Sequence, residues 1–245
     1  MYRTGYSGLT MRLMLKMVTK HLLPQKIEGL YAITPDVADT ALLVRMTRQV
    51  LAGGARLVQY RNKTAEAELR LDQAQTLLNL CREHNVPLII NDHLDLAIAV
   101  GADGIHLGQD DIPVATARYR LGPEKIIGVS CYNHMELATE AEKQGVDYVA
   151  FGAFFVSPTK PNTVTAPMSL LRQSRQMLHV PVVAIGGITL PHVADLIRHG
   201  ADVIAASSSL FGVLDTQSAA ENFSRLITQS RHSIHHPYER PHDFT

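Results

Sequence analysis

From residue 30 onward the chain repeats one pattern eight times: a short apolar run of β-type residues, a polar turn, and a segment with helical periodicity. We expect strands at 30–34, 56–61, 88–92, 104–108, 126–130, 148–154, 182–186 and 203–207. Helical segments such as 40–52, 65–83, 134–144 and 191–198 separate them. This alternation predicts a single closed (β/α)8 TIM barrel, an α/β fold. An open doubly wound sheet is the alternative, but no G-x-G-x-x-G motif follows the first strand.

The repeat defines a predicted barrel domain at residues 28–230, with a further segment at each end. Residues 1–27 are expected to be an N-terminal extension, either an extra helix or a flexible lead-in. Basic residues interrupt its apolar run, so it lacks the roughly 20 consecutive apolar residues of a membrane span. Residues 231–245 contain four histidines, and we expect a flexible tail there.

The charge balance favours small molecules as binding partners. Lys and Arg together number 23, as do Asp and Glu, so no global field points to a nucleic acid or a membrane. Cys81 and Cys131 are the two cysteines, and their separation argues against a disulfide scaffold or a zinc site. A reducing cytoplasm fits this cysteine usage. The sequence leaves open whether the chain forms a homo-oligomer.

Carboxylates follow two neighbouring strands. Asp92 ends the strand at 88–92, and Asp111 comes shortly after the strand at 104–108. Because the carboxyl ends of parallel strands face the same mouth of a barrel, the two side chains are expected to share one hard cation such as Mg²⁺. The alternative is that either acid caps the helix that follows it. For Asp110 we favour a capping role or simple exposure.

The second strand ends in a basic cluster. In Gln59-Tyr60-Arg61-Asn62-Lys63, residues at a spacing of two share a side, so Gln59, Arg61 and Lys63 face the mouth together. An amide, a guanidinium and an ammonium pointing one way suit a phosphate or pyrophosphate. A strand that runs into a solvated basic turn is the alternative.

The later strand ends suggest a second anion site. Hydroxyls and a lysine follow the sixth strand, Gly186-Gly187 follows the seventh, and serines follow the eighth, which is where barrels grip phosphate. The residues concerned are Ser157, Thr159, Lys160, Gly187, Ser207 and Ser208. We expect Cys131 to be a buried inert thiol rather than a nucleophile, and His106 to be a packed barrel residue rather than an acid or base.

With these motifs in place, the chain from about residue 30 to residue 210 resembles the thiamine-phosphate synthase family. Gln59-Tyr60-Arg61-Asn62-Lys63 is similar to its Q-x-R-x-K motif, and Asn91-Asp92 is similar to its N-D motif. The remaining similarities are Gly101 to Asp111, Gly128-Val129-Ser130, Ser157 to Lys160, and Gly186-Gly187-Ile188.

The resemblance implies coupling of 4-amino-2-methyl-5-hydroxymethylpyrimidine pyrophosphate to thiazole monophosphate. By it, Asp92 and Asp111 hold magnesium, and Gln59, Asn91 and Ser130 contact the pyrimidine pyrophosphate. Arg61, Lys63 and Lys160 neutralise the leaving pyrophosphate, so these three and Ser130 form the implied catalytic set. The thiazole phosphate region takes its implied ligands from the later strands: Ser157, Thr159, Gly187 and Ser208. Ser207 joins the predicted substrate-binding residues by its position after the eighth strand.

Two rival functions fit the same fold. A thiazole tautomerase-like isomerase would lack the pyrophosphate-binding set, which is present here: Gln59, Arg61, Lys63, Asn91, Asp92 and Asp111. A non-catalytic sensor of phosphate ligands would need anion sites without magnesium carboxylates.

Overall fold

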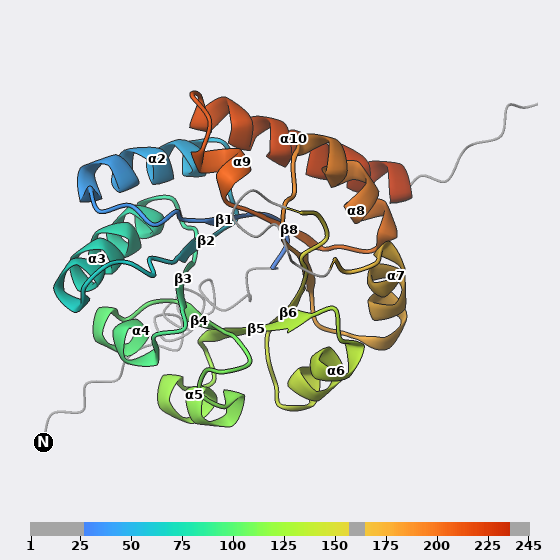
Figure 1. Cartoon of the computed structure of the whole chain (residues 1–245), viewed down its shortest axis with the longest axis horizontal. Coiled ribbons are helices and arrows are strands. Elements are labelled where there is room, and N and C mark those ends of the chain that lie inside the picture. Colours follow the sequence, from blue (N-terminus) through green and yellow to red (C-terminus); the bar gives the residue numbers. More distant parts are fainter. Residues whose placement is uncertain (1–26, 157–164, 236–245) are drawn as a thin grey trace, which may run out of the picture.

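The computed structural model describes residues 27–156 and 165–235, and within them eight strands close into one barrel (Figure 1). Every strand pairs in parallel with the next, and the eighth pairs with the first. The strands are β1 (Gly29–Ile33), β2 (Leu57–Tyr60), β3 (Leu88–Asn91), β4 (Gly104–Leu107), β5 (Ile126–Tyr132), β6 (Tyr148–Phe151), β7 (Val182–Ala184) and β8 (Val203–Ala206). The predicted TIM barrel is confirmed, and the open sheet is excluded.

Helices surround the strands on the outside (Figure 1). They are α2 (Thr40–Ala52), α3 (Ala67–Glu83), α4 (Leu94–Val100), α5 (Val114–Leu121), α6 (Met135–Lys143), α7 (Met168–Met177), the 3₁₀ helix η1 (Leu190–His192), α8 (Val193–His199), α9 (Ser208–Phe211) and α10 (Thr216–His235). Across residues 27–156 and 165–235, none of these helices combines the length and apolar character needed to cross a bilayer.

The ends of the predicted domain differ from the structure in one respect. Helix α10 continues to residue 235, so the boundary predicted at residue 230 falls inside a helix. Residues 1–26 and 236–245, which make up most of the predicted extension and tail, lie outside the described residues.

Two kinds of core hold the barrel together. One lies between the strands and the surrounding helices, where Leu77 and Leu171 are fully buried. The other fills the barrel interior and includes Ile89 and Val183. The interior also holds polar side chains, among them Gln59, Tyr31, Tyr148 and His106. Because buried polar groups are costly unless hydrogen-bonded, this interior needs a connected set of partners.

Three aspartates fasten neighbouring strands at their amino ends. Asp103 accepts a hydrogen bond from Leu88 N at 2.9 Å, and Asp147 and Asp202 accept equivalent bonds from Ile127 N and Val182 N at 2.7 and 2.9 Å. Each therefore joins an even-numbered strand to the one before it, at the barrel end opposite the predicted site. Residues at that end of a TIM barrel serve stability.

Candidate active site

The alternation predicted for the end of β2 is confirmed. Gln59 is buried in the barrel, where its Nε2 donates to the Tyr31 hydroxyl at 2.8 Å. Tyr60 and Asn62 turn the other way, and both donate to Gln73 Oε1 of α3, at 2.9 and 3.1 Å. The side chains on the mouth side are therefore free of the structural bonds that hold β2 to α3.

Residues at the end of β1 position the basic cluster. Asp36 Oδ1 accepts from Lys63 N at 2.9 Å and lies 3.4 Å from Arg61 Nη1. Thr34 Oγ1 accepts from Arg61 N at 2.9 Å and donates to Arg61 O at 3.1 Å. Neither Asp36 nor Thr34 was predicted as a site residue, although a threonine and an aspartate shortly after the first strand are a signal of the same kind as Asp92.

Asp92 and Asp111 lie together, as their places in the barrel predict. Asp92 follows β3 with φ +62°, a left-handed conformation uncommon for residues other than glycine, and Asp111 Oδ2 accepts from Gly108 N at 2.7 Å. Burial raises the pKa of Asp92 to about 6, and a hydrogen bond with Asp111 and the charge of that carboxyl add to the rise. Lys63 and Arg61 oppose it, so both cations are also near this carboxyl.

Neither acid caps a helix, so that alternative is wrong. The residue before α4 is His93, and the residue before α5 is Pro113. Asp110 is exposed, as one of the two expectations for it predicted. In the part of the chain that the structure describes, no three His, Cys, Asp or Glu side chains gather around a common point. The Asp92 and Asp111 pair thus supplies two carboxylates, and a hard cation held by only two carboxylates takes its other ligands from water or phosphate oxygen.

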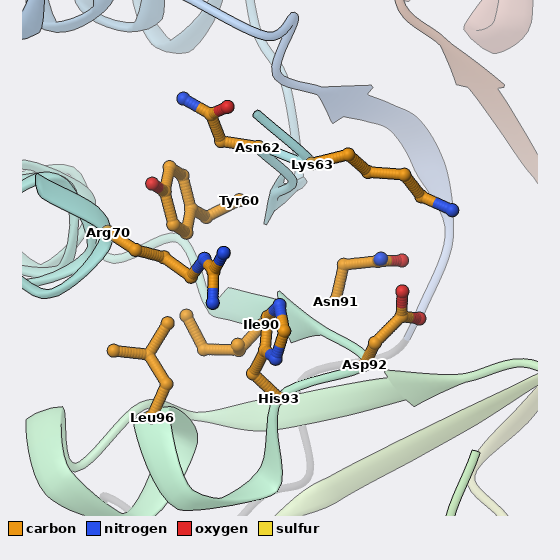
Figure 2. A pocket seen from close by; sticks show the side chains of 9 residues that line it. All are labelled: Tyr60, Asn62, Lys63, Arg70, Ile90, Asn91, Asp92, His93 and Leu96. Carbon is orange, nitrogen blue, oxygen red and sulfur yellow. The ribbon is translucent and has the colours of Figure 1, made fainter. Parts of the chain in front are cut away.

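A pocket adjoins the Asp92 carboxylate (Figure 2). Lys63, Asn91 and Asp92 lie at one end of it, whereas Arg70 and Leu96 lie at the other (Figure 2). Cationic, amide and carboxylate groups from the ends of β2 and β3 therefore face one space. Tyr60 and Asn62 also line this pocket, whereas Gln59, Arg61 and Asp111 are not among its lining residues.

Ser130 is held by a buried histidine. Its Oγ lies 2.8 Å from His106 Nε2, and His106 Nδ1 lies 2.9 Å from the Tyr148 hydroxyl. Burial lowers the pKa of His106 to about 4, so the imidazole is neutral near pH 7. The expectation that His106 is a packed barrel residue is confirmed, and its bond to Ser130 adds a role that sequence spacing did not show.

Cys131 is inert in this environment. The thiol is buried, and its burial raises its pKa to about 12. A thiol in that state supplies no thiolate at neutral pH, so the interpretation of Cys131 as a nucleophile is not supported.

The ends of β7 and β8 form the other side of the mouth. Gly187 has φ +62°, and a Cβ there would lie 2.4 Å from the carbonyl oxygen of Phe155, so only glycine fits between the two loops. Ser209 Oγ donates to Ile188 O at 2.7 Å and joins the loops after β7 and β8. Ser207 is partly buried and Ser208 is exposed at the start of α9. Ser157, Thr159 and Lys160 lie outside the described residues.

Comparison with known proteins agrees with this arrangement. The family model described as thiamine monophosphate synthase matches residues 30–210. The chain belongs to this family. A thiamine-phosphate synthase from Nitrosospira multiformis is 57% identical over 211 residues, which are 86% of this chain and 89% of that relative. A second, from Nitrosomonas eutropha, is 52% identical and covers 82% of this chain and 95% of its own length.

Solved structures give the same answer. Thiamine phosphate pyrophosphorylase from Pyrococcus furiosus is 34% identical and superposes with a TM-score of 0.74, over 82% of this chain and 96% of its own. The 3-hexulose-6-phosphate synthase from Salmonella typhimurium, at 15% identity and a TM-score of 0.66, shares the fold alone. The predicted membership of the thiamine-phosphate synthase family is confirmed, and the enzyme is a transferase of thiamine biosynthesis.

Proposed function

We propose that the enzyme joins 4-amino-2-methyl-5-hydroxymethylpyrimidine pyrophosphate to thiazole monophosphate and releases thiamine phosphate and pyrophosphate. The observation that carries this proposal is the pairing of Asp92 with Asp111 beside Arg61 and Lys63 at one edge of the barrel. Cationic side chains and a divalent cation both neutralise a pyrophosphate, and this edge offers groups that would supply the first and hold the second.

Asp92 and Asp111 would hold Mg²⁺. Two adjacent carboxyls, one with a raised pKa, repel each other when both are ionised, and a divalent cation relieves that repulsion. Carboxylate oxygens are also the donors that magnesium prefers. When bound, the ion supplies positive charge to the pyrophosphate.

The chain's own residues complete the charge balance. Arg61, Lys63 and Lys160 would bind the pyrophosphate oxygens, while Gln59 and Asn91 orient the pyrimidine. The bond between the pyrimidine methylene and the pyrophosphate oxygen breaks, and its electron pair leaves with pyrophosphate. The aminopyrimidine ring stabilises the resulting carbocation, and the lone pair of the thiazole nitrogen forms the new C–N bond. This sequence requires no protein nucleophile.

The thiazole phosphate would bind on the opposite side of the mouth. The groups assigned to it are backbone and hydroxyl donors, which suit a monophosphate without metal: Ser157, Thr159, Gly187, Ser207 and Ser208. This division places the phosphate groups of the two substrates on opposite sides of the mouth, so that the reacting atoms can meet between them. The buried free thiols fit a reducing compartment, and we place the reaction in the cytoplasm.

The test is to supply each substrate alone and then both together, with detection of thiamine phosphate by mass spectrometry. We expect product only from the complete mixture. Isomerisation of a thiazole phosphate with no pyrophosphate release would instead support the tautomerase hypothesis. Saturable binding of both ligands without any product would support the sensor hypothesis.

A further inference from the structure

We propose that five side chains inside the barrel form one directional hydrogen-bond chain that fixes the Ser130 hydroxyl as a donor toward the substrate. In order, the chain runs through Gln59, Tyr31, Tyr148, His106 and Ser130. Its four contacts measure 2.8, 2.9, 2.9 and 2.8 Å. It joins two residues assigned above to the pyrimidine pyrophosphate, so the proposal rests on the proposed function.

The strand register shows why the chain can form. His106, Gly128 and Tyr148 are partners across β4, β5 and β6, so all three face the same side of the sheet. Gly128 carries no side chain, and the Tyr148 ring fills the space above it and stacks on His106 at a centroid distance of 5.6 Å. Tyr148 also meets Tyr31 edge to face, with centroids 6.0 Å apart. The rings are therefore held by packing as well as by their hydrogen bonds.

The direction of the chain starts at Gln59. Its Nε2 can only donate, so the Tyr31 oxygen accepts this bond. If Tyr31 in turn donates to Tyr148, and Tyr148 to His106 Nδ1, each phenolic hydrogen has an acceptor along the chain. Buried hydroxyl groups without a partner are costly, which favours this arrangement over one that leaves a hydrogen unpaired.

The imidazole passes the direction on to Ser130. A neutral histidine has one ring N–H, so a Nδ1 that accepts from Tyr148 leaves the hydrogen on Nε2. Nε2 then donates to Ser130 Oγ, and the serine hydrogen is left to point elsewhere. Substrate phosphate oxygens only accept, so this orientation makes Ser130 a ligand for the pyrophosphate. The opposite orientation would commit the serine hydrogen to His106 and turn its lone pairs toward an anion.

Tyr31, Tyr148 and His106 are positioning residues in this scheme. None of them needs to touch the substrate or transfer a proton. Their effect on turnover should therefore pass through the Ser130 hydroxyl, and it should vanish when that hydroxyl is absent.

The first test is the tautomer of His106, measured in the substrate-free protein by NMR with ¹⁵N-labelled histidine. The protein has 12 histidines, so the His106 signals would be assigned by their loss in a His106→Asn variant. We expect the hydrogen on Nε2 and a bare Nδ1. A hydrogen on Nδ1 would reverse the chain and overturn the proposal. Because no substrate is used, this result is independent of whether the proposed reaction is correct.

The second test compares Tyr148→Phe in the wild-type and Ser130→Ala backgrounds. The variant loses the hydrogen bonds of Tyr148 to Tyr31 and to His106. We expect kcat to fall about tenfold in the first background, because without the bond to His106 the Ser130 hydroxyl is no longer oriented, and by less than about twofold in the second. Equal losses in both backgrounds would contradict action through Ser130.

Tyr60→Phe is the matched control for this comparison. Tyr60 is also buried, and its substitution by phenylalanine removes a phenolic oxygen just as Tyr148→Phe does. The Tyr60 hydroxyl, however, donates to Gln73 of α3 on the outer side of β2. Its effect on kcat should be the same factor in both backgrounds. The two proposals can fail separately. If the wild type forms no thiamine phosphate while His106 carries its hydrogen on Nε2, the proposed function is wrong but the directional hydrogen-bond chain is still supported.

Discussion

The ring of Tyr148 occupies the space that a side chain at Gly128 would need. A Cβ on Gly128 would lie 1.9 Å from Tyr148 Cζ and 2.3 Å from two other ring atoms. Since buried rings cannot shift without disturbing their neighbours, the two residues constrain each other. The glycine of the Gly128-Val129-Ser130 motif therefore serves the interior of the barrel rather than the flexibility of the backbone.

Gly128→Ala should destabilise the enzyme by about 1–3 kcal/mol or more, as overpacking of a core does. Combining it with Tyr148→Ala removes the obstructing ring, so the double variant should be more stable than the sum of the two single losses. Urea unfolding of all four proteins measures this. Strict additivity would show that the ring does not oppose the Cβ. Gly101→Ala is the control, because a Cβ there meets nothing within 4 Å and its cost of about 1–2 kcal/mol comes from the φ of +69° alone, so Tyr148→Ala should not relieve it.

Asp92→Asn should change how stability depends on pH in the presence of a chelator. The Asp92 carboxyl has a pKa of about 6 when folded and an ordinary value of 3.8, so the folded protein binds more protons between these values. The free energy of unfolding of the wild type should therefore fall as the pH rises from about 4 to about 6. The variant should lose this part of the dependence. An unchanged profile would contradict the raised pKa.

Asp36→Ala should weaken the binding of the pyrimidine pyrophosphate. Asp36 holds the Lys63 backbone and faces the Arg61 guanidinium, so its loss releases both basic residues from their present geometry. We expect KM for this substrate to rise about tenfold, the effect of losing one charge-assisted hydrogen bond, with a smaller change in KM for the thiazole phosphate. Steady-state kinetics with each substrate varied in turn tests this. Equal changes in both KM values would argue for a general disturbance of the mouth.

Asp103→Ala should lower stability without lowering turnover. The change leaves the buried Leu88 N–H without its side-chain partner, at a cost of about 1–3 kcal/mol. Asp95→Ala is the control, because Asp95 forms an exposed ion pair with Arg120 and should cost less than about 1 kcal/mol. Chemical denaturation and kcat would be measured on both variants. A loss of kcat in Asp103→Ala would show that this residue contributes to function and not only to the stability of the barrel.

The sequence predicted those features that follow from local periodicity. The eight strands were predictable because each is a short apolar run. That Arg61 and Lys63 face the barrel mouth was predicted from their spacing of two residues along the strand. Partners distant in sequence were not predictable in this way. Tyr31 and Tyr148 are 117 residues apart and meet only because the barrel closes, and the bond between His106 and Ser130 depends on the register of β4 and β5. Asp36 acts through the Lys63 backbone and the Arg61 guanidinium, which are 27 and 25 residues away in the chain, so its role also depends on the closing of the barrel.

The central claim is that Asp92 and Asp111 bind the magnesium ion that pyrophosphate release requires. The most direct measurement is the simultaneous yield of pyrophosphate and thiamine phosphate from both substrates, as Mg²⁺ is titrated into the chelated wild type and the Asp111→Asn variant. We expect equal yields of the two products that rise with Mg²⁺ in the wild type, and a loss of turnover of at least about a hundredfold in the folded variant. Full turnover by the variant, or by the wild type in chelator, would contradict it.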